Sequence, residues 1–487
     1  MGTNNLAHLH AASPGTHGTE STLSGPRSDA RITMAAVGDI LMDRAVQMSA
    51  RALMDPAIEA PHLRVASGFE RLFDEEVRDS LARADIVFAN LETPLALDLS
   101  KRESLDTDGI FVHRQVSVDP GEPYDGRAYT GAGFTFNAHP ALALALKNTG
   151  FNIVSTANNH SLDRGSNGVD LTIDALRAAG IEHIGTRRST DSSHGPCAPH
   201  AVKNIKGVRI AFFAWTSPLN GVGGLWGSRD RLHQVSTLMS APPSIGNTAT
   251  NPAAQQAGPQ SGTRPHSGLE SITAQIATAR QDSTVDLVVV SVHWGIQCVC
   301  NPSPLQRRLA HAMSNAGADI ILGHHPHVLQ PIERYTAPDG RQTLVAYSLG
   351  NFVSGYWRPW GRRLRLHERV SVILDVDITK RNSSTTISDV RYLPTISVSR
   401  TLNHVKIIQV AKLADPPQGG RTTRLVESSL HGKTGRLAWM SISYLVKNPF
   451  CALLSASDVV CEGIIALRLA VTGSHRRAQD SRLRKDR

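Results

Sequence analysis

Short apolar runs alternate with amphipathic stretches along most of this chain. The runs contain mainly Val, Ile, Leu and Phe, and they cover residues 32–37, 84–89, 152–156, 208–215, 285–292, 318–322 and 343–347. Runs of this length and composition are typical of strands that are buried on both faces. The amphipathic stretches cover residues 68–83, 140–149, 168–179, 269–280 and 304–316. Strands that alternate with helices predict an α/β layered fold with a largely buried sheet.

Three segments fall outside this pattern. Residues 1–30 are polar and predict a disordered N-terminal arm, and residues 240–268, rich in Pro, Gly, Ala, Ser and Gln, predict a flexible insertion. We therefore expect one domain over residues 31–400 that contains this insertion. Residues 401–487 predict a poorly defined C-terminal extension that ends in a basic tail.

The composition restricts the class of protein and its location. Hydrophobic residues make up 40% and charged residues 19% of the chain, as in soluble globular proteins. Charged residues and a proline interrupt the apolar region at 437–471, and the first 30 residues contain no apolar signal region, so we predict neither a transmembrane segment nor a signal peptide. The expected location is cytoplasmic or peripheral to the membrane. The five cysteines form no C-x-x-C pair, which argues against a zinc ribbon or a disulfide scaffold.

The net charge of +9 favours an anionic partner. Much of the excess is in the tail at residues 475–487, for which a solvated surface is the simpler interpretation. The basic residues form no evident stripe, so we do not expect specific binding of nucleic acid.

Polar residues follow several apolar runs at the point where each run ends. They form the motifs GD (38–39), NLETP (90–94), ANNHSLDRG (157–165), HWG (293–295), GHHPH (323–327) and SLGNF (348–352). Because ligands bind beyond the carboxyl ends of strands in α/β sheets, we expect these residues to converge. Their mixture of carboxylate, amide and imidazole groups suits a divalent metal such as zinc, iron or manganese.

Two of these motifs predict a local geometry. In an extended chain His325 and His327 would lie on one face, with His324 pointing the other way as a surrounding residue. Asn159 could place its amide on a metal, with His160 beside it as a general acid oriented by Asp163. A polar turn that bonds its own backbone is the alternative for that motif.

These motifs, in this order, resemble the poly-gamma-glutamate capsule synthesis protein (CapA) family, a branch of the calcineurin-like metallophosphatase superfamily. The resemblance implies a four-layered αββα β-sandwich flanked by helices, with two divalent metal ions (Mn, Zn or Fe). By position it implies metal ligands at Asp39, Glu92, Asn159, His293, His325 and His327, and catalytic roles for His160 and Asp163. Asn90, His324 and Asn351 are predicted to surround the ligands, although Gly350 and Asn351 suit a tight turn equally well.

The chain departs from the family pattern at two positions. Asp39 is followed by Ile40 and Leu41, whereas the superfamily motif is D-x-H. Gln297 stands where this branch usually has the glutamate of HWG-x-E. Both departures remove groups that could serve a metal centre.

The resemblance implies a metal-dependent hydrolase that acts on a phosphoester or an anionic polymer. Its context would be biosynthesis or export of capsular poly-gamma-glutamate, with capsule synthase subunits as partners. The alternative is a non-catalytic, metal-containing scaffold that binds the polymer, and the two departures favour this alternative.

Overall fold

The computed structural model describes residues 9–11, 29–96, 100–105, 111–116, 136–191, 201–217, 235–238, 268–355, 357–358, 362–363, 365–382, 384–399, 405–412 and 416–432. The predicted insertion therefore lies outside the described residues except for residue 268. Most of the predicted N-terminal arm and the chain beyond residue 432 also lie outside them.

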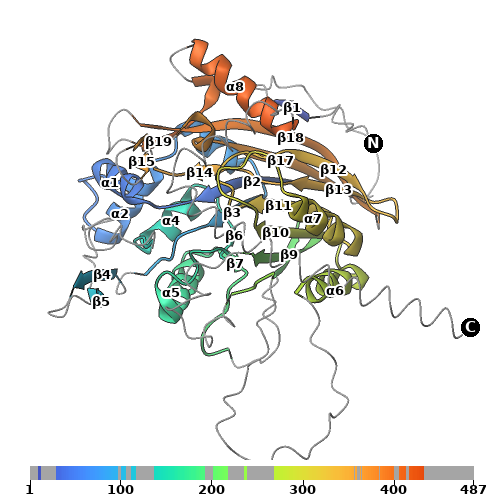
Figure 1. The fold of residues 1–487 in the computed structure, drawn as a ribbon, viewed down its shortest axis with the longest axis horizontal. Helices are drawn as coiled ribbons and strands as arrows, with labels where there is room; N and C mark the ends of the chain where they lie inside the picture. The colour runs from blue at the N-terminus through green and yellow to red at the C-terminus, as the bar shows by residue number, and fades with distance from the viewer. Residues whose placement is uncertain are drawn as a thin grey trace, which may run out of the picture.

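Two sheets form the centre of the described structure (Figure 1). The first sheet has the order β1-β18-β17-β2-β3-β6-β7, with β14 beside β2 and β19 beside β18. Its strands are β1 (Leu9–Ala11), β2 (Ala30–Ile40), β3 (Ile86–Leu91), β6 (Ile153–Ser155), β7 (Glu182–Ile184), β14 (Asn351–Val353), β17 (Val370–Arg381), β18 (Ser384–Ser399) and β19 (Val405–Gln409). Strands β2, β3, β6 and β7 are parallel, so their carboxyl ends lie at one edge.

The second sheet has the order β12-β13-β11-β10-β9-β8. Its strands are β8 (Ala201–Ile205), β9 (Val208–Thr216), β10 (Leu287–His293), β11 (Ile320–His324), β12 (Ile332–Thr336) and β13 (Gln342–Ala346). Strands β9, β10, β11 and β13 are parallel. The seven predicted strands all belong to these two sheets.

Helices cover the outer face of each sheet. Those packed on the first sheet are α1 (Arg44–Leu53), α2 (Pro61–Glu70), α3 (Glu75–Ala82), α4 (Ala141–Asn148) and α5 (Gly165–Ala178). Those packed on the second sheet are α6 (Gly268–Gln281) and α7 (Pro304–Ala316). Figure 1 shows α1, α2 and α4 on one side of the sheets, and α6 and α7 on another.

Three hydrophobic clusters confirm the predicted αββα layers. One cluster joins the facing sides of the two sheets, and the other two lie between a sheet and its helices. Strand β2 shows how the sequence produces this arrangement. Ile32, Met34 and Ala36 face the other sheet, whereas Ala35 and Val37 face the helices, because strand side chains alternate with period two.

The single helix predicted over residues 68–83 is wrong. The structure has two helices there, α2 and α3, which are separated by residues 71–74. The backbone of this break pairs with β19, since Ile407 N donates to Leu72 O and Asp74 N donates to Ile407 O. The Asp74 side chain then accepts from Glu75 N at the start of α3. The cap and the strand pairing stabilise the break.

The described part of residues 401–487 packs on the sandwich. Ile407 of β19 belongs to a core cluster, and Val426 and Leu430 of α8 (Pro416–Leu430) join the cluster between the sheets. The predicted boundary at residue 400 stays a prediction. Smaller elements are the pairs β4 (Ser100–Leu105) with β5 (Phe111–Val116) and β15 (Trp357–Arg358) with β16 (Arg362–Arg363), and the 3₁₀ turns at Leu366–Glu368 and Val410–Lys412. Within the described residues, no helix has both the length and the apolar character to cross a bilayer.

Candidate metal centre

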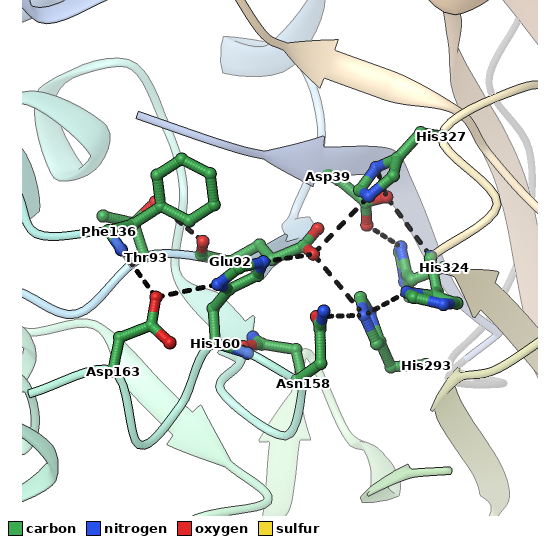
Figure 2. Close-up of polar contacts among 12 residues, drawn as sticks. Asp39, Glu92, Thr93, Phe136, Asn158, His160, Asp163, His293, His324 and His327 are labelled. Carbon is green, nitrogen blue, oxygen red and sulfur yellow. Dashed lines mark hydrogen bonds and ion pairs between the residues drawn. The ribbon is translucent and has the colours of Figure 1, made fainter. Parts of the chain in front are cut away.

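The predicted metal ligands lie together at the carboxyl ends of strands from both sheets (Figure 2). They are Asp39 in β2, Glu92 after β3, Asn159 after β6, His293 at the end of β10, and His325 and His327 after β11. The close approach of β2 and the loop before β14 depends on a glycine. A Cβ at Gly38 would lie 2.0 Å from the Gly350 carbonyl oxygen, so the smallest residue is required beside Asp39.

Glu92 lies at the middle of this group. Its Oε1 is 3.5 Å from His293 Nε2, 3.7 Å from His327 Nε2 and 3.9 Å from His160 Nε2. Both carboxylate oxygens are buried, and within the described part of the chain no hydrogen-bond donor reaches either one. Burial raises the pKa of Glu92 well above its usual value; the charge of Asp39 adds to this shift, and that of His327 opposes it. A carboxylate in this position is costly unless a cation compensates its charge.

A first set of ligand atoms surrounds His293. Its Nε2 lies 2.9 Å from Asn159 Oδ1 and 3.1 Å from His325 Nδ1, in addition to the contact with Glu92. One imidazole nitrogen cannot form hydrogen bonds with three such atoms at once. Metal–ligand bonds of about 2.1 Å would separate neighbouring ligand atoms by roughly 3.0–3.4 Å in octahedral or tetrahedral geometry. The observed spacing fits a metal ion bound between these four side chains.

The second set combines Asp39, Glu92 and His327. These residues present ligand atoms that all lie within 4.8 Å of one another, and Asp39 Oδ2 is 3.2 Å from His327 Nδ1. The other oxygen of Asp39 accepts a hydrogen bond of 2.9 Å from Asn90 Nδ2 and lies 3.2 Å from His324 Nδ1. Burial acts to raise the pKa of Asp39, but His324 and His327 outweigh it and hold that pKa well below the usual value. Asp39 is therefore an ionised carboxylate with one oxygen available to a metal.

His327 is held by Asn351. Its Nδ1 lies 2.9 Å from Asn351 Oδ1, and Asn351 Nδ2 donates to the His327 carbonyl at 3.3 Å. Burial lowers the pKa of His327, but Glu92, Asp39 and Asn351 together raise it to about 9. Asn351 thus contacts a predicted ligand directly, and it is the first residue of β14, directly after Gly350, whose φ is 70°.

The imidazoles of His325 and His327 reach one site, but the backbone of these residues is not the predicted extended chain. Their φ angles are 93° and 56°, so both residues adopt left-handed backbone. This conformation costs a non-glycine residue about 1–3 kcal/mol and is found mainly at functional sites. The expectation that His324 points away is also wrong, because its ring is fully buried against Asp39.

His160 and Asp163 form the predicted pair. His160 Nδ1 lies 2.7 Å from Asp163 Oδ2, which also accepts a hydrogen bond of 2.6 Å from Phe136 N. The Phe136 ring packs edge-on against the imidazole with centroids 4.4 Å apart. These contacts fix the ring so that Nε2 faces Glu92 (Figure 2).

Sequence reasoning missed two residues that organise this site. Asn158 Nδ2 donates to Asn90 Oδ1 and Leu91 O, while its Oδ1 accepts from His160 N. Asn158 therefore links the loop after β6 to the residue that holds Asp39. Its position directly before Asn159 was a signal for it, whereas Phe136 lies in the separate FNAHP motif (136–140), which supplies none of the predicted ligands.

The two departures from the family pattern can be located. Leu41 occupies the position of the D-x-H histidine, and its backbone N–H donates to Val353 O as part of the β2–β14 pairing. Gln297 lies in the loop after β10, next to Cys298, whose N–H donates to Pro326 O at 2.8 Å. That loop therefore contacts the segment that carries His325 and His327.

A family model described as "Bacterial capsule synthesis protein PGA_cap" matches residues 33–356. The chain is 28% identical over 357 residues to the capsule biosynthesis protein CapA of Bacillus anthracis, covering 72% of this chain and 67% of that protein. It is 32% identical over 208 residues to the PGA biosynthesis protein CapA of Bacillus subtilis, covering 43% of this chain and 44% of that protein. Among solved structures, a calcineurin-like phosphoesterase from Bacillus subtilis matches with a TM-score of 0.35 and 12% identity, covering 85% of this chain and 99% of that one.

Proposed function

The chain belongs to the bacterial capsule synthesis protein family PGA_cap, and from this premise we propose that it is a metal-dependent hydrolase in the biosynthesis or export of an anionic capsular polymer. Its substrate is poly-gamma-glutamate or a phosphoester, and its partners are subunits of a capsule synthase. The B. anthracis and B. subtilis relatives, named for capsule and PGA biosynthesis, support this context.

The observation that carries the proposal is the environment of Glu92. Its carboxylate is buried without a hydrogen-bond donor in the described part of the chain, among imidazole nitrogens at 3.5–3.9 Å. A purely structural role would leave the free energy of this arrangement unexplained, because buried carboxylates are normally paired. Two metal ions that share Glu92 would compensate its charge.

The residues divide into two sets of ligands. Asn159, His293 and His325 would hold one ion and Asp39 and His327 the other, with Glu92 between them. Two divalent ions, when bound, supply a water nucleophile at neutral pH and stabilise negative charge on the reacting group. Imidazole and carboxylate ligands are compatible with Mn, Zn or Fe.

The chain itself supplies the proton donor. His160 Nε2 is 3.9 Å from Glu92 Oε1, and Asp163 holds Nδ1 on the opposite side of the ring. The carboxylate of Asp163 stabilises the protonated imidazole and directs its Nε2–H toward the centre. His160 then protonates the leaving oxygen or nitrogen, and Asp163 keeps its own charge.

The test measures metal content and turnover separately. The full-length protein and its Asp39→Ala, His325→Ala and His311→Ala variants would be assayed for bound metal and for Mn-, Zn- and Fe-dependent hydrolysis of phosphoesters and of poly-gamma-glutamate. His311 is the matched control, since it stacks on Tyr335 at 4.1 Å, outside the site. We expect metal and turnover in the parent and the His311 variant, and loss of both in the other two.

A non-catalytic scaffold that binds the polymer is the competing function. The leucine at position 41, in place of a histidine ligand, and the glutamine at position 297 favour it. Stoichiometric metal without turnover on any substrate would select the scaffold. Absence of metal from the parent protein would contradict both functions.

A further inference from the structure

We propose that the Cys298 thiol and the Glu368 carboxylate act together to position His327 at the metal centre. Neither residue belongs to the predicted ligands, and the two are called the thiol–carboxylate pair below. The inference rests on the proposed function for the metal that His327 would bind. Its test also measures how the pair holds the backbone without metal, so the two proposals can fail separately.

The segment that the pair holds has a backbone that its own residues disfavour. His325 and His327 have φ angles of 93° and 56°, and Pro326 lies between them. Left-handed backbone in residues with a Cβ persists only where surrounding contacts impose it. His327 also has the most exposed side chain of its proposed ligand set, at 16% against 0% for Asp39 and Glu92. It is therefore the ligand of that set that depends most on support from outside.

The loop after β10 binds this segment at residues before and after His327. Cys298 N donates to Pro326 O at 2.8 Å, and Gln330 Nε2 donates to Val299 O at 2.7 Å. Cys298 itself has a φ of 62°, so it too adopts left-handed backbone. Because a non-glycine residue in this conformation needs contacts that hold it, the anchoring of Cys298 decides how firmly the carbonyl before His327 is held.

The Cys298 side chain supplies that anchor. Its Sγ donates to Glu368 Oε1 at 3.4 Å, and the two residues are 6% and 1% exposed. The other carboxylate oxygen, Oε2, accepts from Arg365 N at 2.8 Å. Burying a carboxylate is costly unless its oxygens accept hydrogen bonds, so the thiol has a defined position against Oε1. The contact fixes the Cys298 side chain and, through it, the N–H that holds Pro326.

The main chain of Glu368 reaches His327 by a second route. Its carbonyl oxygen accepts from Asn351 Nδ2 at 3.0 Å, and His327 O accepts from the same nitrogen at 3.3 Å. Carbonyl oxygens only accept, so the amide nitrogen of Asn351 faces them and its Oδ1 faces His327 Nδ1 at 2.9 Å. That ring nitrogen then donates, which leaves Nε2 for a metal. Nε2 lies 3.7 Å from Glu92 Oε1, inside the proposed centre.

The pair supports one of the two proposed ion positions more than the other. Its two routes end at the backbone before His327 and at the ring of that residue. The position near His293 also has ligands after β3 and β6, with Asn159 Oδ1 at 2.9 Å from His293 Nε2. Loss of the pair should therefore weaken the ion bound by Asp39 and His327 and leave the other ion bound.

The experiment compares variants of the full-length protein. C298A removes the thiol, C298S keeps a donor there, and E368Q leaves a single acceptor oxygen in place of two. The double variant C298A/E368Q tests whether the two residues act as a unit. C300A is the matched control, because Cys300 is also a buried cysteine of this loop, at 3% exposure. H327A identifies which Mn²⁺ dissociation constant belongs to the position that contains His327.

Two properties are measured on each protein. Hydrogen–deuterium exchange in chelator follows the Cys298 amide, which donates to Pro326 O, and so reports the hold on the backbone without metal. Calorimetric titration with Mn²⁺ gives the Kd of each ion, and electron paramagnetic resonance distinguishes neighbouring Mn²⁺ ions from isolated ones. Thermal unfolding checks that each variant is folded.

We expect C298A and E368Q to accelerate exchange at residue 298 and to raise the Kd of the ion at His327 by about 10–100-fold, while the other Kd changes less than about twofold. The double variant should match the larger single effect to within about twofold, because both residues act through one contact. C298S should raise the Kd less than C298A does, and C300A should change neither property. The spin-coupled signal of the parent should be replaced by that of isolated Mn²⁺ in C298A.

Equal effects of C298A and C300A would reduce the pair to general packing of the loop and overturn the proposal. Faster exchange with an unchanged Kd would overturn it as well, since the pair would then support the fold without positioning the histidine. Equal weakening of both ions would refute the route through His327. A parent protein that binds no Mn²⁺ would contradict the proposed function, and exchange at residue 298 in chelator would then decide this inference alone.

Discussion

Replacing Glu92 by glutamine keeps the shape of the side chain and removes its charge. Burial raises the pKa of Glu92 well above the 4.5 of a free glutamate. A carboxyl group with a raised pKa contributes stability below its unfolded pKa and loses it as the pH rises through the folded value. Near neutral pH and without metal, the buried Glu92 therefore costs the folded state free energy, either through a buried charge or through uptake of a proton. Glutamine avoids that cost, but it cannot compensate the charge of a metal ion.

The size of the effect follows from the buried, unpaired oxygens of Glu92. Leaving a buried polar group unsatisfied costs about 1–3 kcal/mol. Unfolding entropy of about 2.1 cal/mol/K per residue gives roughly 0.7 kcal/mol/K for a domain of about 320 residues. Glu92→Gln should therefore raise the Tm of the metal-free protein by about 1.5–4 °C. Metal at a hundredfold excess over its Kd stabilises the parent by about 2.7 kcal/mol, or about 4 °C, and should not stabilise the variant.

The assay is differential scanning calorimetry in chelator and in excess Mn²⁺ or Zn²⁺. The expected result is a crossing: the variant is the more stable protein in chelator and the less stable one with metal. Glu333→Gln is the matched control, because Glu333 accepts a hydrogen bond of 2.6 Å from the Tyr347 hydroxyl. That variant should lose stability equally in both conditions. A Tm for Glu92→Gln below that of the parent in chelator would refute the argument from burial. A parent Tm that does not change when metal is added would refute the metal centre.

Three further predictions concern the chemistry and the fold. Asp163→Asn should reduce kcat about 10²-fold or more through the neighbouring imidazole while bound metal is unchanged, as measured by steady-state kinetics and elemental analysis. The pKa of Asp377 is lowered to about 2: burial opposes this shift, but the hydrogen bond from Arg391 and others outweigh it. Asp377 therefore contributes stability above its unfolded pKa of about 4 that is lost as the pH falls toward about 2, so Asp377→Asn should cost about 1–2 kcal/mol in urea unfolding at about pH 7 and roughly half of that at about pH 3. Gly38→Ala should destabilise the fold by about 3 kcal/mol or more, because its methyl group would overlap the Gly350 carbonyl; urea unfolding with an unchanged midpoint would contradict this geometry.

Much of the central architecture could be predicted because buried parallel strands have a distinctive sequence. Each of the seven apolar runs became a strand, and the polar residues that follow them converge as the rule for α/β sheets requires. The family expectation is confirmed by the match over residues 33–356. Strands β17 and β18 were not predicted, because they are partly polar; they form a hairpin with each other, and β17 also pairs with β2, which is distant in the sequence. Strands of this kind depend on tertiary pairing more than on local composition.

The candidate site, too, could be predicted only in part from the sequence. Residue types and spacing identified the groups that bear the chemistry, but the backbone that delivers them could not be read from an H-x-H pattern. His325 and His327 adopt left-handed φ values that a local rule would exclude. The surrounding contacts impose this conformation, since His325 N approaches Asp39 Oδ2 at 3.3 Å and His327 is held by Asn351. Neither contact can be inferred from residues close in sequence.

The two proposed ion positions differ in how much the missing D-x-H histidine matters. The position near His293 is built from one amide, two imidazoles and the shared carboxylate, none of which involves residue 41. The other position depends on Asp39 and His327, and one oxygen of Asp39 is already bonded to Asn90. Leucine at position 41 therefore removes a ligand only from the Asp39–His327 position, which already has fewer protein ligands. The position near His293 stays complete. Fewer protein ligands also leave more coordination sites open to water or substrate, which is the arrangement of catalytic rather than structural metal sites. The departure that favours a scaffold on sequence grounds is thus compatible with a hydrolase once the geometry of the two positions is compared.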